Sequence, residues 1–169
     1  MEFTIPEGIQ VEVMSPGVLQ VNAGGEKTEL KYNSKLMTIQ KKGNSLEINP
    51  NKKQNRINNA AMISLTKHLL NFARGAKQAF EKKLQVVYAH FPVTVEVKGT
   101  DVHIKNFLGE KLPRNARVVG STQVKVNGQE ITVSGKNKEH VGQTAANLVT
   151  ATRIRKKDVR VFQDGIYYV

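Results

Sequence analysis

Hydrophobic and polar residues alternate along several short stretches of the first half of the chain, which is the pattern of half-buried β-strands. The alternation predicts strands over residues 9–13, 18–23, 30–33, 37–42 and 45–48. Turn residues separate these stretches at Gly17, at Gly24-Gly25 and at Gly43-Asn44. Short strands joined by tight turns indicate antiparallel pairing.

After Asn55 the apolar spacing changes to every third or fourth residue, which is the period of an amphipathic helix. The predicted apolar stripe contains Ala61, Leu65, Leu69, Phe72, Ala76 and Phe80. Gly75 interrupts this stripe, and we expect it to bend or break the helix. Lys52, Lys53 and Arg56 precede the helix, and we interpret them as solvated cations.

The second half repeats this order of alternating stretches followed by a helical stripe. Strands are predicted over residues 84–91, 94–98, 101–106, 117–120, 123–126 and 130–134. Asn127-Gly128 is a tight-hairpin signal, because both residues accept the positive φ of a two-residue turn. Asn137 is positioned to cap the last helix. The apolar face of that helix carries Val141, Ala145, Leu148 and Thr152.

An internal repeat relates the two halves of the chain. The matching pairs are Ile9–Val13 with Val93–Val97, Val18 with Val102, Gly25–Lys27 with Gly109–Lys111, and Ala60-Ala61 with Ala145-Ala146. The offset is 84 residues for the first three pairs (93 minus 9) and 85 for the last (145 minus 60). The sequence therefore predicts an α+β fold of two tandem similar units, each an antiparallel sheet packed on one face by a helix. The first repeat is residues 1–83, and the second is residues 84–169 with a basic C-terminal tail.

The chain is strongly basic, with 26 Lys and Arg against 14 Asp and Glu and a formal net charge of +12. Such an excess repels itself in a compact state and implies an anionic partner, most commonly nucleic acid. The absence of cysteine excludes a disulfide framework and thiolate metal sites. The N-terminus shows no signal-peptide pattern, and no apolar run approaches the ~20 residues that span a membrane. We therefore expect a soluble, intracellular protein.

No recognisable catalytic, cofactor-binding or metal-binding motif is present in the sequence. Gly25-Glu26-Lys27-Thr28 lacks the Gly-Lys-Ser/Thr ending and the earlier glycine of a phosphate-binding loop. The histidines lie far apart, without a second ligand at metal spacing, and no serine lies in a nucleophile elbow. We expect no enzymatic activity, no cofactor, no metal site and no small-molecule substrate.

The C-terminal stretch from Gly142 to Val169 combines features of a surface that binds polyphosphate. It passes from a helix into a dense run of cations and ends with two tyrosines. Cations neutralise phosphates and aromatic rings stack on unpaired bases, so the stretch suits RNA before DNA. A solvated charged terminus has the same composition, and the pattern leaves both interpretations open. The candidate RNA-binding residues here are Arg153, Arg155, Lys156, Lys157, Arg160, Gln163 and Tyr167.

Two further segments carry candidate residues. Residues 105–114 place cations on both sides of Phe107-Leu108, which we expect to anchor the segment, although an ordinary long hairpin loop has the same pattern. Gly142 is expected in the first turn of the last helix, where amides favour anions and a glycine permits close backbone approach. Alternatively, Gly142 only eases packing of the helix on the sheet. The candidates are Lys105, Asn106, Lys111, Arg114, Gly142, Gln143 and Asn147, with Arg117 also within reach of phosphates.

Four segments give the chain a specific resemblance to a known family. They are Gly75–Phe80 leading into Val87–Pro92, Lys105–Lys111, Val141–Asn147 with Ala151–Ile154, and Lys157–Tyr167. On these residues the chain resembles the archaeal and eukaryotic branch of the large-subunit ribosomal protein six family (L-six), called L-nine in eukaryotes. The resemblance covers nearly the whole chain and is most specific over the second half.

The resemblance implies a structural constituent of the ribosome, built from two similar α+β units and without enzymatic activity. Family members bind large-subunit ribosomal RNA, mainly through the second unit, near the base of the factor-binding stalk and close to the sarcin–ricin region. The implied partners are large-subunit ribosomal RNA and neighbouring ribosomal proteins at the stalk base, with no membrane. The implied location is the large ribosomal subunit in the cytoplasm. The RNA-contacting segments of the family fall here on the 105–114 loop, the helix start at Gly142 and the 153–168 tail.

The first unit departs from the family pattern at its second turn. Family members have Lys-Gly-Pro-Lys-Gly there, whereas this chain has Asn22-Ala23-Gly24-Gly25-Glu26-Lys27. The proline is missing and a charge is displaced, which argues against an RNA contact by this turn. Two other classes remain as alternatives, an RNA-processing or RNA-modifying enzyme and a DNA-architectural protein. Turnover of RNA or nucleotide would favour the first, and preference for duplex DNA over folded RNA would favour the second.

Overall fold

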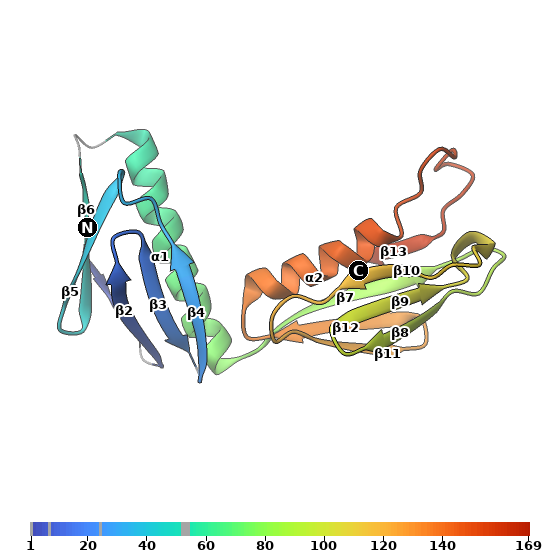
Figure 1. The fold of residues 1–169 in the computed structure, drawn as a ribbon, viewed down its shortest axis with the longest axis horizontal. Helices are drawn as coiled ribbons and strands as arrows, with labels where there is room; N and C mark the ends of the chain where they lie inside the picture. Colours follow the sequence, from blue (N-terminus) through green and yellow to red (C-terminus); the bar gives the residue numbers. More distant parts are fainter. Residues whose placement is uncertain (1, 7, 24, 52–54) are drawn as a thin grey trace. The chain divides into compact units, whose positions relative to one another are not determined.

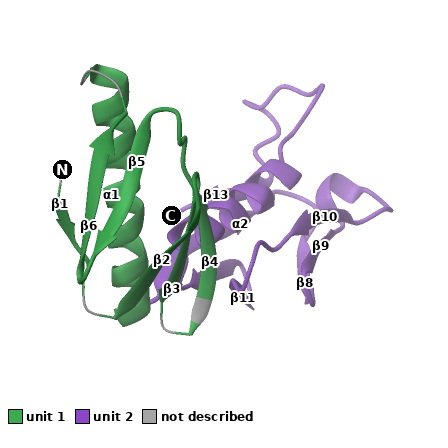
Figure 2. Ribbon diagram, turned by 60° about the vertical axis from the view of Figure 1, so that its left-hand side comes forward, with its two compact units in different colours: residues 1–78 green, residues 79–169 purple. Residues whose placement is uncertain are grey.

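The protein divides into two compact units, residues 1–78 and residues 79–169, which Figure 2 colours separately. The structure is a computed structural model that describes residues 2–6, 8–23, 25–51 and 55–169. Some of the sequence interpretations concern positions outside these described residues. They are the interpretation of Lys52 and Lys53 as solvated cations and of Gly24 as part of a turn. The division comes before strand β7 (Phe80–Val87), so residues 80–83 belong to the second unit.

Unit 1 contains two three-stranded antiparallel sheets among its described residues, with one helix against them (Figure 1). Its strands are β1 (Glu2–Thr4), β2 (Ile9–Ser15), β3 (Val18–Ala23), β4 (Glu26–Lys31), β5 (Met37–Lys42) and β6 (Ser45–Pro50). The strand orders are β2-β3-β4 and β1-β6-β5. The predicted alternation is present, since Leu19, Val21 and Ala23 of β3 are buried and the residues between them are less so.

Helix α1 (Arg56–Lys77) begins where the sequence period changes. The side chain of its N-cap residue, Asn55, accepts a hydrogen bond of 2.9 Å from the Asn58 amide, which satisfies one donor of the first turn. The buried face includes Met62, Leu65, Leu69, Phe72 and Ala73. Most of the predicted apolar stripe is therefore the face that α1 turns toward the core.

The C-terminal end of α1 differs from the sequence prediction in two respects. Gly75 is buried and the helix continues through it to Lys77, so the predicted break is wrong. Burial of the surrounding face outweighs the ~1 kcal/mol that a glycine costs in a helix interior. Phe80 does not extend the helical stripe, because the helix is capped at Gln78 and Phe80 begins β7.

Unit 2 likewise contains two antiparallel sheets and one helix among its described residues (Figure 1). After β7 come β8 (Thr94–Lys98), β9 (Asp101–Lys105), the short 3-10 helix η1 (Phe107–Gly109), β10 (Arg114–Arg117), β11 (Gln123–Asn127), β12 (Glu130–Gly135) and β13 (Gly165–Tyr168). The strand orders are β10-β9-β8 and β11-β12-β7-β13. The strand predicted over residues 117–120 lies instead at Arg114–Arg117, paired with β9.

Helix α2 (Lys138–Ala151) presents the predicted apolar face to the core of unit 2. The Asn137 side chain caps it by accepting a hydrogen bond of 2.9 Å from the Glu139 amide. Val141, Ala145 and Leu148 are all essentially inaccessible to solvent. The cap assignment and the buried face are therefore both confirmed.

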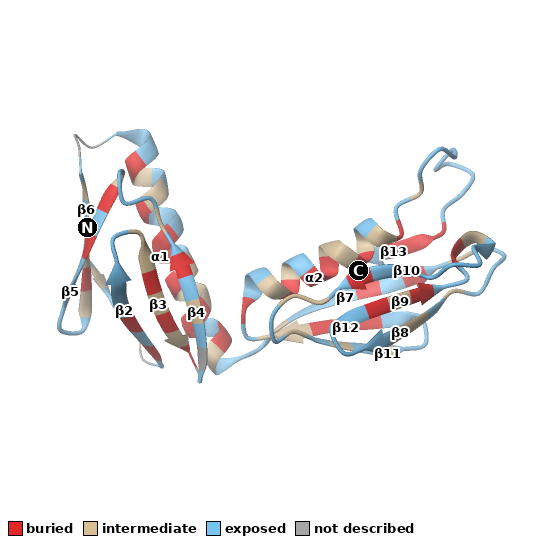
Figure 3. Cartoon of the chain, in the orientation of Figure 1, coloured by how far each residue is buried: buried red, intermediate tan, exposed pale blue. Residues whose placement is uncertain are grey.

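The two units share one topology, which confirms the α+β fold of tandem similar units. Sheet β2-β3-β4 corresponds to β8-β9-β10, and β1-β6-β5 corresponds to β7-β12-β11, with β13 added at the edge of unit 2. The apolar residues of each unit are distributed over two sheets rather than the single sheet expected. Each unit has its own hydrophobic core, visible as the buried positions in Figure 3.

Two details of the repeat register are corrected by the pairing. Val13 pairs with Leu19 in unit 1 and Val97 pairs with Val102 in unit 2, so Val102 corresponds to Leu19 and not to Val18. A bulge between Val13 and Ser15 accounts for the shift. In the helices, Ala145 is buried whereas Ala60 is exposed, so the match between the two Ala-Ala pairs is not structural.

Candidate nucleic-acid interface

The C-terminal tail of unit 2 is a loop closed at its base, because both of its ends are anchored to the core. The Ile166 amide donates a hydrogen bond of 3.0 Å to the Thr152 hydroxyl at the end of α2. Asp164 is buried and accepts a bond of 3.4 Å from the Ala89 amide. Strand β13 then pairs with β7, which fixes the residues that follow. Residues 153–163 are therefore held between two fixed points, and most of them are exposed.

The cations of the tail differ in how far they are committed to partners within the chain. Arg160 forms an ion pair of 3.0 Å with Asp158, and this hydrogen-bonded contact lowers the pKa of the Asp158 carboxyl. The Lys157 ammonium lies 4.6 Å from the centre of the Phe162 ring. Arg155 and Lys156 are exposed, and neither forms an ion pair with any described residue. Together with Arg153, which is likewise exposed and forms no ion pair with a described residue, Arg155 and Lys156 are thus the tail cations most available to an external anion.

The 105–114 segment is anchored by its apolar pair, as the sequence predicted. Phe107 is only 1% exposed, and Leu108 packs partly buried against the same core. Asn106 has φ of 58°, and its side-chain amide donates a hydrogen bond of 3.0 Å to the Pro92 carbonyl. Gly109 has φ of 75°, and a Cβ there would lie 3.2 Å from the Phe91 ring. The turn is therefore a defined structure on the core rather than a loose hairpin loop.

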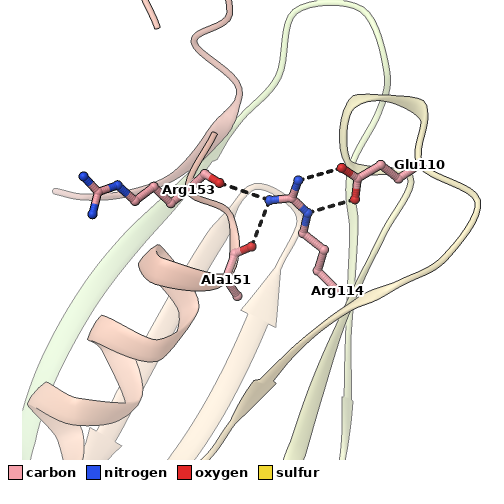
Figure 4. A network of polar contacts seen from close by, with 4 residues as sticks. All are labelled: Glu110, Arg114, Ala151 and Arg153. Atoms are coloured by element: carbon pink, nitrogen blue, oxygen red, sulfur yellow. Dashed lines mark hydrogen bonds and ion pairs between the residues drawn. The ribbon is translucent and has the colours of Figure 1, made fainter. Parts of the chain in front are cut away.

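Arg114 ties this turn to the end of α2 (Figure 4). Its guanidinium donates to both Glu110 carboxylate oxygens, at 2.8 Å and 2.6 Å. It also donates to the backbone carbonyls of Ala151, at 3.0 Å, and Arg153, at 3.3 Å. The guanidinium lies 4.3 Å from the centre of the Phe107 ring. We refer to this set of contacts as the Arg114 clamp.

The Arg114 clamp changes the role expected for Arg114. Its hydrogen bond to the Glu110 carboxylate lowers the pKa of that carboxyl and raises the pKa of Arg114 itself. Carbonyls at a helix C-terminus are favourable partners for a cation. These contacts occupy the Arg114 guanidinium and join the turn to the start of the tail. The Arg153 side chain points away from the clamp, toward solvent (Figure 4).

An open groove of about 610 Å³ lies between β10 and the end of α2. It is lined by Arg114, Asn115, Ala116, Arg117, Asn147, Thr150, Ala151, Arg153 and Arg155. Four arginines therefore converge, two from β10 and two from the tail, and no Asp or Glu is among the lining residues. Planar guanidinium groups in a concave surface suit phosphate oxygens, which they bind in a bidentate manner. We call this surface the arginine groove.

The structure brings together some of the predicted candidates and separates others. Arg114, Asn147, Arg153 and Arg155 share the arginine groove. Lys105 is instead paired with Glu96 at 2.7 Å, which lowers the pKa of the Glu96 carboxyl. Lys111 is exposed beyond the turn. The groove also contains Asn115 and Thr150, which the sequence analysis did not single out, because a lone polar residue in a strand or helix carries no distinctive signal.

Gly142 does not lie in the first turn of α2, so that prediction is wrong. The helix begins at Lys138, and the Val141 amide already donates to the Asn137 carbonyl at 3.1 Å. The Gly142 amide therefore belongs to the continuous helical ladder rather than to the free donors of the N-terminus. A Cβ at Gly142 would meet no atom within 4 Å. The alternative that this glycine eases helix–sheet packing is also wrong.

The polar candidates on α2 and in the tail are hydrogen-bonded to neighbours. Gln143 donates to the Asn147 side chain at 2.9 Å, and Asn147 donates to the Arg117 carbonyl at 2.8 Å. Gln163 donates to the Arg160 carbonyl at 3.3 Å, and the Tyr167 hydroxyl donates to the Gln163 carbonyl at 3.1 Å. Tyr167 remains 46% exposed, so its ring is still open to a partner.

Comparison with known proteins assigns this architecture to a family. A family profile described as ribosomal protein L6 matches residues 91–165, which include the turn, the groove and the tail. The large ribosomal subunit protein uL6 of Methanobrevibacter smithii is 44% identical over 172 residues, covering 99% of this chain and 93% of the relative. The chain belongs to the ribosomal protein L6 family. Proteins named uL6 from Methanococcus vannielii (41% identical, covering 95% of this chain and 93% of the relative) and Methanosarcina mazei (44%, covering 98% and 93%) are similar along their lengths.

Membership of the L6 family confirms the resemblance inferred from the sequence. It makes the chain a structural constituent of the large ribosomal subunit rather than an enzyme, as predicted. In the described part of the chain no helix has the length and apolar character to cross a membrane. Within those same residues no cluster of three or more potential metal ligands occurs.

Proposed function

We propose that this L6-family chain binds large-subunit ribosomal RNA through unit 2 and helps to organise the RNA near the base of the factor-binding stalk. The arginine groove carries the RNA-binding part of the proposal. Its arginines come from β10 and the tail, and no carboxylate lines it. The stalk-base position, the contacts with neighbouring ribosomal proteins and the cytoplasmic location rest on the family resemblance.

Phosphate contacts in this proposal are divided among residues with different roles. Arg117, Arg153 and Arg155 contact RNA phosphates directly from the groove, and Arg155 is joined by Lys156 from the exposed tail. Arg114 holds the groove in shape through its clamp. Lys111, Lys157 and Arg160 do not line the groove and act as secondary cations. The exposed Tyr167 ring offers a stacking surface for an unpaired base.

The proposal is tested by measuring binding of the purified chain to full-length large-subunit ribosomal RNA in competition with duplex DNA. We expect the RNA to compete at least tenfold more effectively, because folded RNA offers closely spaced phosphates and unpaired bases. We also expect the protein to stay with large ribosomal subunits through a high-salt wash. Equal competition by DNA, or complete release into the wash, would contradict the proposal.

Gly142 provides a prediction in which stability and binding change in opposite directions. A side chain at this position meets open space and removes the ~0.5–1 kcal/mol that glycine costs a helix, so Gly142→Leu should raise the free energy of unfolding. If RNA approaches the helix backbone here, the same side chain should weaken RNA affinity by about tenfold, or ~1.4 kcal/mol. Thermal unfolding and RNA titration measure the two effects. If the variant is more stable but its affinity for RNA is unchanged, Gly142 does not belong to the RNA interface.

A further inference from the structure

Helix α1 of unit 1 carries an exposed face that is unusually rich in cations. Its exposed charged residues are Arg56, Lys67, Arg74 and Lys77. The helix contains no Asp or Glu, and the sequence has none between Glu47 and Glu81. None of the four cations forms an ion pair with a described residue. This face therefore lacks the intrahelical Glu–Lys pairs that usually stabilise a solvated helix surface.

Three of these cations lie on one line along the helix. At 100° per residue, Arg56, Lys67 and Arg74 fall within about 20° of each other. At 1.5 Å per residue they are separated by about 16 Å and about 10 Å along the axis. Lys77 lies about 60° to one side. A straight row of unpaired cations over several helical turns is complementary in charge to a row of phosphates.

The position of Arg56 indicates that this row is not arranged to stabilise the free protein. Arg56 is the first residue of α1, where the helix dipole disfavours a cation, and no acidic residue occupies that turn. The corresponding helix of unit 2 also begins with an exposed cation, Lys138, but Glu139 lies beside it in the first turn, and its other exposed residues, Gln143 and Thr150, are uncharged. The cationic face is therefore particular to unit 1 and is not a shared feature of the repeated fold.

We propose that unit 1 binds the phosphate backbone of RNA through the cationic face of α1, as a second RNA contact in addition to the arginine groove. This inference rests on the proposed RNA-binding function and assigns a role to the unit whose second turn has lost the family pattern. The contact needs no base recognition, because the row consists of charges and not of bidentate base-reading groups.

The chemistry of the α1 surface favours RNA over an acidic protein or a membrane. Protein interface cores are depleted in charge and enriched in aromatic residues, and the outer face of α1 has no aromatic residue. The exposed Ile57 and Ile63 lie about 120° apart on the helix and so form no continuous apolar patch. The apolar face that a membrane-surface helix needs is already packed in the core of unit 1.

The salt dependence of binding tests this contact with the full chain. The variant Arg56→Ala/Lys67→Ala/Arg74→Ala should lower affinity for large-subunit ribosomal RNA by about tenfold and reduce the salt slope by about 2 to 3. The matched control is Lys31→Ala/Lys35→Ala/Lys41→Ala, which removes the same charge from exposed positions of unit 1. We expect this control to change the slope by less than about 1. Equal effects of the two variants would overturn the proposal.

Cross-linking identifies the partner directly, because the chain has no cysteine of its own. A photo-cross-linker is attached to Ala60→Cys, on the cationic face, and separately to Thr150→Cys, in the arginine groove, in reconstituted large subunits. RNA adducts from both positions support the proposal. Adducts from position 150 alone, or purely protein adducts from position 60, overturn this inference and leave the proposed function intact. No RNA adduct at either position would overturn both.

Discussion

Replacing Arg117, Arg153 and Arg155 with alanine is expected to weaken binding of the chain to large-subunit ribosomal RNA by about 100-fold at 0.1 M salt. Each lost phosphate contact should remove roughly 0.7–0.9 from the slope of log affinity against log salt, so the slope should fall by about 2 to 3. The three side chains are exposed, and none forms an ion pair with a described residue. Filter binding across a salt series, with unfolding measured in parallel, gives both quantities.

A matched variant separates groove contacts from general charge. Lys83→Ala/Lys98→Ala/Lys125→Ala removes three exposed cations of unit 2 from β7, β8 and β11, outside the groove lining. Its effect on affinity should stay below about fivefold, as expected for cations that act only through long-range attraction. If the two triple variants bind equally weakly, net charge and not the arginine groove accounts for RNA binding.

Arg114→Ala is expected to destabilise unit 2 by about 2–3 kcal/mol, because it removes charge-assisted hydrogen bonds and leaves carbonyls at the end of α2 without their donor. Arg114→Lys keeps the charge but cannot form the two-pronged contact with Glu110 while also reaching both carbonyls. We expect it to recover about half of the loss. Amide hydrogen exchange in β10 and α2 is a suitable measurement, because it reports on unit 2 alone. If the amides of β10 and α2 are as well protected from exchange in Arg114→Ala as in the wild type, the Arg114 clamp does not stabilise unit 2.

The Glu110 partner gives the clamp a predictable pH dependence. The hydrogen bond from Arg114 lowers the pKa of the Glu110 carboxyl in the folded state, so the pair stabilises the fold above the unfolded pKa of about 4.3. That contribution is lost as the pH falls through the lowered folded pKa. The difference in unfolding free energy between the wild type and Glu110→Gln should be constant near neutral pH and shrink in acid. A difference that grows on acidification would contradict this assignment.

Most of the secondary structure follows from local sequence signals. Alternation located strands such as β3 and β5 to the residue. The change of period after Asn55 located the start of α1, and the polar cap Asn137 located the start of α2. The missed strands are those with little local signal. Strand β1 has three residues, and β13 is defined by pairing with β7, whose sequence lies about 80 residues earlier. Such pairing depends on the packed core and not on the pattern of the strand itself.

The sequence predicted which segments contain the candidate RNA-binding residues. It predicted only in part which of those residues lie together on one surface. The sequence identified the basic tail and the Phe107-Leu108 anchor because composition and hydrophobicity are local properties. It could not show that Arg160 is paired with Asp158 or that Lys105 is paired with Glu96. It also placed Gly142 in the first turn of α2, although the Asn137 cap, which the sequence itself indicated, puts that turn at residues 138–141.

By itself the sequence determined the two-unit α+β organisation, the family and the excess of cations that requires an anionic partner. These properties are carried by residue type and spacing, which tertiary contacts do not alter. Only the tertiary structure decided which cations remain available. Folding brings Arg114 against Glu110 and the end of α2, and it leaves Arg117, Arg153 and Arg155 around one groove. Availability depends on distances between segments far apart in the chain, and those distances exist only once the two sheets and α2 have packed.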